Sequence, residues 1–494
     1  MSGARPNILL ITTDQQRFDT TGDAKPTFLR TPHIDLLGYQ GVQFTRAYAD
    51  CPLCVPARVG IMTGTQVFTH GVANNDQTSN VMGREGTLPT YLRACGYQTA
   101  AIGKMHFGPQ RVRHGFEEMI LPDDYYRDIR HSGSARQPMH HGLGQNELYP
   151  TLATVPESMT LTSWIAEQCV EYILVRRDPT LPFFLWCSFA KPHPPLDAPE
   201  PYYSMYQNSP IPAPAVGAWR DSEDCPISFD RQAQRRAFDS IPDEAIHAAR
   251  AVYYGLITQI DNVIGRLISA LEDSGLFNDT FIMFASDHGE MLGDHRNGAK
   301  TFFYEPSSHV PFILRMPQSW DNRRHGTIVD VPITHADILP TLVSVAGGEP
   351  PSDTDGQDLV ALARGELAHP RRYLEGMSGP RWPQAERIPC VYLAITDGQW
   401  KYIWYPEGPT EHLFNLADDP AELHNLAHES RYAAKKQELQ GELIARHRER
   451  ESVYLEEGKL PVREPQVETT ADRRNTATNH AGFRTEYSDA DVRH

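Results

Sequence analysis

The sequence contains little cysteine and no long hydrophobic run. Its seven cysteines are an odd number spread through 494 residues, which excludes the disulfide framework of a small secreted domain and favours reduced thiols. The N-terminal segment has one arginine and an apolar run of only four residues, too short for a signal peptide or for a membrane span of about 20 residues. We therefore expect a cytoplasmic protein without a membrane anchor.

Positive charge is also scarce. The chain has 46 lysines and arginines against 63 aspartates and glutamates, and its net charge of −17 gives no general attraction for nucleic acid. Any anionic ligand must therefore be held by a local cationic site that works against the field of the whole chain. The apolar fraction of 40% is that of a globular protein, and the length suggests two to four domains of about 150 residues, or one large domain with an appendage.

Short apolar runs alternate with segments of helical spacing. The runs predicted to be buried strands are residues 7–14, 98–103, 183–189, 280–287 and 311–316. Helical spacing is clearest over 244–273 and is also present around 157–176. This alternation predicts an α/β fold with a large, mainly parallel central sheet flanked by helices. Such sheets bind ligands beyond the carboxyl ends of their strands, where Asp14 and Asp287 are expected.

The chain is predicted to have three parts. Residues 1–370 carry the α/β pattern, and 371–455 have the alternation and turns of a smaller C-terminal α+β subdomain with an antiparallel sheet and one helix. Residues 456–494 form a polar tail, predicted to be either disordered or an arm that is ordered by a partner subunit of a homo-oligomer. Within the first part, 190–243 lacks periodicity and is predicted to be a long surface excursion.

The densest chemical signal is CPLCVPARVGIMTG, residues 51–64. Pro56 suits the first turn of a helix, so Cys54 is expected at a helix N-terminus, where free N–H groups and the dipole favour an anion. Arg58 adds a fixed positive charge beside it. A Cys-x-x-Cys pair also occurs in redox dithiols and in zinc sites, and these alternatives stay open together with that of a buried, inert cysteine.

This segment resembles the signature of the type I, formylglycine-dependent sulfatases of the alkaline phosphatase superfamily. Their pattern C-x-P-[SA]-R-x4-T-G is matched in full from Cys54 to Gly64, and the chain is similar to the arylsulfatase, choline-sulfatase and phosphonate-monoesterase branch. The resemblance implies that a formylglycine-generating maturation enzyme oxidises Cys54. It also implies that the hydrated aldehyde then acts as the nucleophile, and that the other six cysteines are ordinary packing residues.

The resemblance also implies a divalent cation. Asp14 matches a carboxylate ligand at the end of the first strand, and Gln15 stands where a second aspartate is usual and is expected to bind through its carbonyl oxygen. The pair Asp287-His288 matches the second set of ligands, and Cys54 joins them. This mostly hard set suits Ca²⁺, with Mg²⁺ or Mn²⁺ as alternatives. Without the resemblance, such an Asp-His pair is more often structural.

Three further positions match catalytic positions of the family. Lys104 and His106 lie in a G-K-x-H-x-G motif and are expected to reach the sulfate and the hydroxyl of the nucleophile. His193 lies in KPHPP and is expected to be the general acid for the leaving oxygen. Taken alone, the Lys-His pair is more typical of a solvated strand end, and His193 of a loop shaped by its neighbouring prolines.

Two more positions are assigned to substrate by resemblance. Lys300 is expected to bind the sulfate, and Asn75, which lies 21 residues after Cys54, to bind substrate. His309 stands where the family commonly has arginine, so its role is left open. The loops expected to contact the alcohol include Arg381 and Trp382.

The predicted activity is hydrolysis of a sulfate monoester of a small carbohydrate, or second of an aryl or alkyl alcohol. The closest alternative is a phosphonate monoester or phosphodiester hydrolase on the same scaffold. By the resemblance, phosphonate monoesterases lack the pair at Lys104 and His106, which favours the sulfatase. A two-metal phosphatase is less favoured because it uses serine or threonine as nucleophile. A non-catalytic binding protein is less favoured because no nucleophile or metal position is lost outright.

Overall fold

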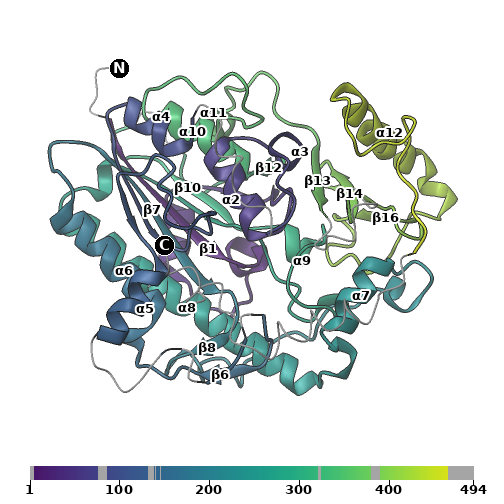
Figure 1. Ribbon diagram of the computed structural model, residues 1–494, viewed down its shortest axis with the longest axis horizontal. Coiled ribbons are helices and arrows are strands. Elements are labelled where there is room, and N and C mark those ends of the chain that lie inside the picture. Colours follow the sequence, from purple (N-terminus) through teal and green to yellow (C-terminus); the bar gives the residue numbers. More distant parts are fainter. Residues whose placement is uncertain are drawn as a thin grey trace.

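The computed structural model describes residues 5–75, 86–131, 138, 141–144, 146–320, 324–379 and 390–465. Its centre is an eight-stranded sheet in the order β11-β2-β10-β9-β1-β7-β4-β5 (Figure 1). These strands are β1 (Asn7–Asp14), β2 (Val42–Phe44), β4 (Gln98–Gly103), β5 (Glu118–Ile120), β7 (Phe183–Pro192), β9 (Thr280–Ser286), β10 (Phe312–Arg315) and β11 (Thr327–Val329). All five predicted strands are present.

Strand direction places the polar residues that follow the central strands at one edge of the sheet. Strands β9, β1, β7, β4 and β5 run parallel, whereas β10 is antiparallel to both β9 and β2. The sheet is therefore mainly parallel, as predicted, and one of its predicted strands runs the other way. The carboxyl ends of β1, β4, β7 and β9 lie together, and Asp14, Lys104, His193 and Asp287 stand at or directly after them.

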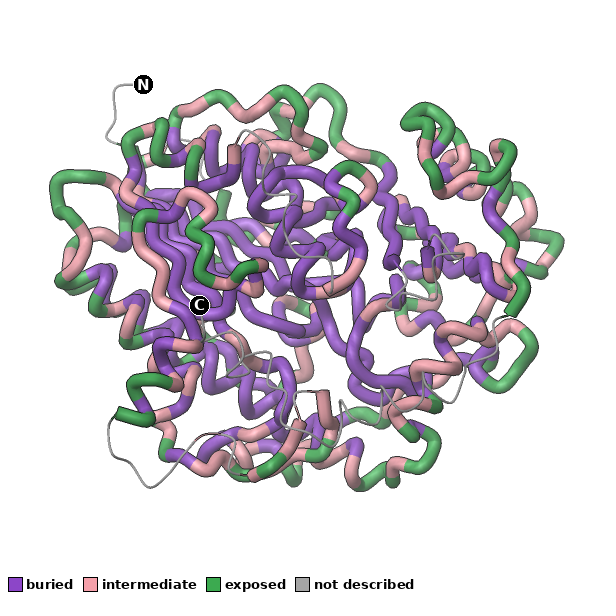
Figure 2. The backbone as a smooth tube through the Cα atoms, in the orientation of Figure 1, coloured by how far each residue is buried: buried purple, intermediate pink, exposed green. Residues whose placement is uncertain are grey.

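Helices cover both faces of the sheet, as the apolar runs require. In β1, Ile8 and Leu10 belong to one core and Leu9 and Ile11 to the other. The first face is covered by α2 (Cys54–Thr63), α4 (Leu88–Ala94), α10 (Ile338–Val345) and α11 (Leu359–Arg364), and the second by α1 (Pro32–Tyr39), α6 (Leu161–Glu171) and α8 (Asp243–Asp273). Figure 2 shows the central strands buried and the exposed residues on the outer sides of the helices.

The shorter elements connect these layers. They are β3 (Ala47–Tyr48), β6 (Pro150–Leu152), β12 (Ile333–Thr334), α3 (Val67–His70), α5 (Pro122–His131) and α9 (Glu305–Ser308). Among the helices in the described ranges, none combines the length and the apolar character that a membrane crossing requires.

A second, antiparallel sheet lies to the right of the central sheet in Figure 1. It consists of β13 (Leu374–Ser378), β14 (Tyr392–Thr396), β15 (Trp400–Tyr405) and β16 (Thr410–Asn415), with α12 (Ala433–Glu449) packed on it. The sequence predicts this sheet and helix, and both are present. The domain limits at 370 and 455 stay a prediction. Most of the predicted tail, 466–494, lies outside the described residues.

The prediction of a long surface excursion over 190–243 is wrong in part. The segment contains β8 (Leu196–Ala198), which pairs with β6, and α7 (Ile227–Arg235). Its aromatic residues are buried in two different places: Tyr202 joins residues of α8, whereas Trp219 joins residues of the C-terminal sheet. Because each of these side chains meets a different partner, their spacing shows no period although they are buried.

Candidate active site

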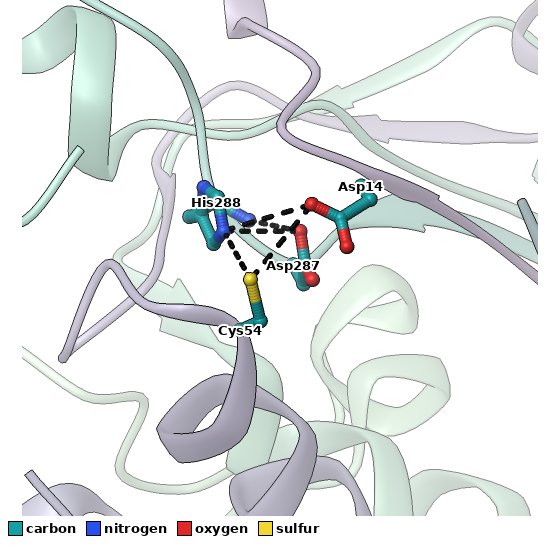
Figure 3. A group of neighbouring side chains, drawn as sticks. All are labelled: Asp14, Cys54, Asp287 and His288. Atoms are coloured by element: carbon teal, nitrogen blue, oxygen red, sulfur yellow. Dashed lines mark hydrogen bonds and ion pairs between the residues drawn. The ribbon is translucent and has the colours of Figure 1, made fainter. Parts of the chain in front are cut away.

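Six buried side chains meet at the carboxyl edge of the parallel strands. We call this group the strand-end cluster, and its members are Asp14, Cys54, Arg58, Lys104, Asp287 and His288, each at most 4% exposed. Figure 3 shows four of them pointing toward one another, with Cys54 at the tip of a helix. The sheet and α2 thus bring together residues that are up to 274 positions apart in the chain, from Asp14 to His288.

Cys54 lies at the first position of α2, as predicted. Leu53 before it is extended, and Gly64 ends the helix in the left-handed conformation with φ 67°. Pro56 lies in the first turn, where a missing N–H costs no helical hydrogen bond. The N–H of Val55 is satisfied by the amide oxygen of Asn75 at 3.0 Å. The helix N-terminus is therefore directed into the strand-end cluster.

The surroundings of Cys54 favour negative charge on its side chain. Its Sγ lies 3.2 Å from Nε2 of His288 and 3.9 Å from Oδ1 of Asp14. Burial and Asp14 raise the pKa of the thiol, but Lys300, Lys104 and His288 outweigh them and lower it to about 6. In contrast, burial raises the pKa of Cys51, the other thiol of the motif. The two cysteines are therefore electrostatically unlike.

Each of the two carboxylates in the cluster pairs with cationic side chains through only one of its oxygens, Oδ2. Oδ2 of Asp14 lies 2.8 Å from Nζ of Lys104 and 3.4 Å from the guanidinium of Arg58. Arg58 also donates two hydrogen bonds to Oδ2 of Asp287, at 3.0 and 3.1 Å. Burial alone would raise the pKa of Asp14, but Lys104, His193 and Arg58 hold it well below its usual range. Arg58 thus orients both carboxylates.

The other carboxylate oxygens face the inner side of the cluster and fit a cation. Donor atoms of Asp14, Cys54, Asp287 and His288 all lie within 4.8 Å of one another. Ligands on opposite sides of Ca²⁺, each at about 2.3–2.6 Å, are about 5 Å apart, so this spacing suits one such ion. Two carboxylates and an imidazole are also suitable donors for Mn²⁺ or Mg²⁺.

Gln15, the fifth predicted ligand, is held by hydrogen bonds within the chain. Its Oε1 accepts from Nζ of Lys300 at 2.5 Å, and its Nε2 donates to Glu290. The backbone of Gln15 has φ 71°, an uncommon conformation for a residue other than glycine, which turns the chain sharply after β1. Gln15 therefore lies beside the cluster, between it and Lys300.

His193 and Lys300, which are far apart in the sequence, are in contact. Nζ of Lys300 lies 2.9 Å from Nε2 of His193. Nδ1 of His193 lies 2.6 Å from the carbonyl of Pro194, which assigns a proton to Nδ1 and turns Nε2 toward Lys300. Lys191 holds this loop by donating to the carbonyls of Pro195 at 2.5 Å and His193 at 3.4 Å.

Two predicted site residues, His106 and Asn75, lie at the margin of the strand-end cluster. His106 follows β4 two residues after Lys104, is half-buried, and has φ 57°. Asn75 uses its side-chain oxygen to cap α2, and the residues after it, 76–85, lie outside the described ranges. Arg381 and Trp382 also lie outside the described residues.

His309 belongs to a different group of charges. Its Nδ1 lies 2.6 Å from Oε2 of Glu305, and its ring stacks on Phe18 at 4.1 Å. Glu305 in turn pairs with Lys401 at 2.7 Å. We call Glu305, His309, Lys401 and Glu422 the Lys401 cluster.

Two residues that support the site were not predicted. Glu290 accepts hydrogen bonds from the amide of Gln15 and from the backbone N–H of Leu292 at 2.9 Å. Its position two residues after His288 was a usable signal. Ser188 accepts from Arg58 at 2.9 Å and donates to the carbonyl of Lys104 at 2.6 Å, and a serine within an apolar strand gave no such signal.

Comparison with known proteins identifies the family. The family model named Sulfatase matches residues 6–348. The chain belongs to the sulfatase family. It is accordingly a hydrolase that acts on sulfuric ester bonds, and the predicted family and alkaline-phosphatase-like fold are confirmed. A second model, the C-terminal region of N-sulphoglucosamine sulphohydrolase, matches residues 293–449.

Individual relatives cover most of this sulfatase. An arylsulfatase of Clostridium perfringens is 33% identical over 480 residues, which cover 92% of this chain and 97% of the relative. A choline-sulfatase of Rhizobium meliloti is 32% identical, covering 87% and 84%. The crystal structure of a phosphonate monoester hydrolase of Agrobacterium radiobacter superposes with a TM-score of 0.78 at 29% identity, covering 90% and 96%.

Proposed function

We propose that this sulfatase hydrolyses a sulfate monoester of a small alcohol, a carbohydrate first and an aryl or alkyl alcohol second, with a formylglycine made from Cys54. The observation that carries the proposal is the placement of Cys54. This residue lies at a buried helix N-terminus and begins the full family motif. Its neighbours Lys300, Lys104 and His288 lower the pKa of its thiol. The same surroundings would stabilise an oxygen nucleophile at this position.

Formylglycine would supply a hydrated aldehyde, with one hydroxyl to attack sulfur and a second through which sulfate is expelled. The chain supports both events with its own charges. Lys104 and Lys300 lie where they would stabilise the oxygens of the sulfuryl group, and His106 is the proposed base for the second hydroxyl. Arg58 keeps Asp14 and Asp287 oriented through its bonds to their Oδ2 atoms.

A divalent cation, which we propose to be Ca²⁺ with Mn²⁺ or Mg²⁺ as alternatives, would supply Lewis acidity at the sulfate oxygens and the nucleophile. Asp14, Asp287 and His288 would hold it with the modified residue 54, and their converging donor atoms support this assignment. Gln15 would join them by turning its amide oxygen from Lys300.

His193 is the proposed general acid. Its Nδ1 donates to the carbonyl of Pro194, so its Nε2 is the atom that would carry the transferred proton, and it lies beside Lys300.

Phosphonate monoester hydrolysis is the second candidate, favoured by the superposition on the Agrobacterium radiobacter enzyme. A matched pair of 4-nitrophenyl sulfate and 4-nitrophenyl phenylphosphonate decides between the two. We expect the higher kcat/KM with the sulfate, because Lys104 and His106 match the sulfatase motif. A higher kcat/KM with the phosphonate would make that ester the principal substrate.

We further propose that the protein is cytoplasmic and that a formylglycine-generating enzyme modifies it in the cytoplasm. None of the seven cysteines, which all lie in the described ranges, is paired in a disulfide, and this supports a reducing compartment. The acidic net charge supports the absence of nucleic-acid partners. A homo-oligomer built on the C-terminal tail stays a prediction.

A further inference from the structure

The chain turns sharply as it leaves β1, directly after Asp14. We call residues 15–17 the β1 turn. Gln15 in this turn has φ 71°, in the left-handed region that residues other than glycine rarely adopt. Such a conformation persists only where contacts from the rest of the protein hold it, and it often marks a functional site. The contacts of the β1 turn therefore determine how its neighbours are presented to the strand-end cluster.

Two N–H groups of the β1 turn are bonded to Asp287 and to the end of β9, the strand directly before it. The N–H of Gln15 donates to Oδ1 of Asp287 at 3.1 Å, and the N–H of Gln16 donates to Oγ of Ser286 at 2.8 Å. The other oxygen of Asp287, Oδ2, accepts from Arg58. Oδ1 is the oxygen assigned above to the proposed cation, so the position of the Gln15 backbone sets the direction of a cation ligand.

The carbonyl of Gln15 and the N–H of Arg17 meet one hydroxyl group, that of Tyr253. This hydroxyl donates to the carbonyl at 2.7 Å and accepts from the N–H at 2.9 Å, so it bridges the two ends of the turn. Tyr253 is 0% exposed and lies on α8, a helix of 31 residues that packs on the central sheet. Burial raises the pKa of its hydroxyl well above the ordinary value, so the group keeps the proton that it donates. A side chain on a long, packed helix is a firm anchor for a strained turn.

The side chain of Gln15 extends the effect of the turn to the cationic residues. Its Oε1 accepts from Nζ of Lys300 at 2.5 Å, and the same Nζ lies 2.9 Å from Nε2 of His193. Its Nε2 donates to Glu290, which fixes the direction of the amide. A shift of the β1 turn would therefore act on the carboxylates and on the cationic side of the site.

We infer that Tyr253 is a positioning residue for the hydrolysis. Its hydroxyl holds the backbone of Gln15, and through this backbone it orients Asp14 and Asp287 around the proposed divalent cation. Through the side-chain amide of the same glutamine it keeps Lys300 in place at the sulfate. The inference rests on the proposed function, because it takes the cation and the sulfate as the partners of these residues. Tyr253 acts through the two backbone groups that it binds, and not by contact with the reacting atoms.

The variant Tyr253→Phe removes this hydroxyl and leaves the ring. We expect the dissociation constant for Ca²⁺, measured by competition with a chelating dye, to rise by at least about tenfold, because loss of a group behind a metal ligand commonly costs about 10–100-fold in affinity. The value of kcat/KM for 4-nitrophenyl sulfate, divided by the fraction of modified residue 54, should fall by about tenfold or more. Unaltered values of both quantities would overturn the inference.

The matched control is Tyr206→Phe. Tyr206 is also buried, and its hydroxyl also accepts from the backbone N–H of an arginine, Arg30, at 3.0 Å and bonds a second oxygen, Oγ1 of Thr258, at 2.7 Å. These partners belong neither to the β1 turn nor to the strand-end cluster. Both variants should therefore lower the thermal midpoint by similar amounts, whereas only Tyr253→Phe should weaken Ca²⁺ binding and lower kcat/KM. Equal effects of the two variants on both quantities would make Tyr253 a purely structural residue and contradict the inference.

Failure of the proposed function would be distinguishable. If the unaltered protein binds no Ca²⁺, Mn²⁺ or Mg²⁺, the cation assignment fails, and if it hydrolyses phenylphosphonate esters and not sulfates, the sulfatase proposal fails. In either case, kcat/KM for the ester that is hydrolysed still decides the role of Tyr253. A loss of about tenfold in Tyr253→Phe without a loss in Tyr206→Phe supports that role, and equal values in the two variants overturn it.

Discussion

The strand-end cluster and the Lys401 cluster are both buried and both join lysine to carboxylates, but their hydrogen bonding differs. In the Lys401 cluster, Nζ of Lys401 donates to the carbonyl of Phe303 at 2.8 Å, to Glu305 at 2.7 Å and to Glu422 at 2.8 Å. The remaining oxygens of the two glutamates accept from His309 and from the N–H of Glu305. Three ammonium protons thus meet three acceptors, and nothing is turned toward a ligand.

In the strand-end cluster, the carboxylates give only their Oδ2 atoms to Arg58 and Lys104. The Oδ1 atom of Asp14 faces Cys54 and His288. Lys300 and Lys104 lower the pKa of the Cys54 thiol in this cluster. The comparison teaches that a buried ion cluster is structural when its donors and acceptors are matched internally, and is suited to catalysis when one side of it converges on a reacting atom.

The largest effect is expected for Cys54→Ala. Removal of the nucleophile should lower kcat by about 10⁴-fold or more, while the thermal midpoint changes little because a small side chain is replaced by a smaller one. Kinetics on an aryl sulfate and a thermal melt check both parts. Cys51→Ala is the control, since Cys51 is also buried but its thiol pKa is raised. Similar losses in both variants would contradict the distinction between the thiols.

Removal of the cation should give the next largest effect. After treatment with EDTA we expect kcat to fall by about 100-fold or more, and Ca²⁺ to restore it. Without the ion that they would hold together with His288, the carboxylates of Asp14 and Asp287 repel the anionic sulfate group. Elemental analysis before and after chelation measures the metal content. Full activity in a protein shown to be free of metal would remove the cation from the account.

In the Lys401 cluster, removal of the cation, here the lysine ammonium, should lower stability. Lys401→Met leaves two buried glutamates without their cation, and we expect the free energy of unfolding to fall by about 3–5 kcal/mol. Urea denaturation measures this loss. Lys435→Met is the control, since Lys435 forms its pairs with Asp397 and Glu438 nearer the surface and should contribute less than about 1 kcal/mol. Equal losses would contradict the larger contribution to stability that is expected of the Lys401 cluster.

A smaller effect of pH is expected next to the Lys401 cluster. Burial lowers the pKa of His412, which contacts Tyr304 at 3.0 Å, to about 4. The unfolded chain, with the ordinary value of about 6.5, then binds more protons below that pH, so stability falls as the pH drops from about 6.5 toward 4. At pH 5 the cost is about 2 kcal/mol. Urea midpoints between pH 7 and 5 measure it, and His412→Gln should flatten the curve. An identical pH dependence in that variant would assign the effect to other groups.

The sequence was sufficient to predict the central strands of the sheet because these strands are buried on both faces. Continuous apolar runs such as 7–14 can be recognised without a partner, and Asp14 and Asp287 are expected at the same edge as soon as parallel strands are assumed. The run 311–316 was recognised as a strand, but its antiparallel direction depends on its neighbours β2 and β9 and leaves no local signal.

The sequence named candidate site residues but not the contacts between them. The motif around Cys54 placed it at a helix N-terminus, yet no pattern showed that Arg58 bonds both Asp14 and Asp287. The contact between Lys300 and His193 joins residues 107 positions apart, and the segment around Trp219 lacks periodicity because its neighbours come from the other sheet. Such contacts are determined by tertiary packing, which spacing along the chain does not encode.

Peptide mass spectrometry of purified, active protein tests the central claim most directly. The peptide with residue 54 should be lighter by about 18 Da than its cysteine form, because oxidation of the thiol to an aldehyde replaces sulfur by oxygen and removes two hydrogens. The fraction of modified peptide should rise in proportion to kcat across preparations made with different amounts of the maturation enzyme. Full activity with residue 54 present only as unmodified cysteine would contradict the account.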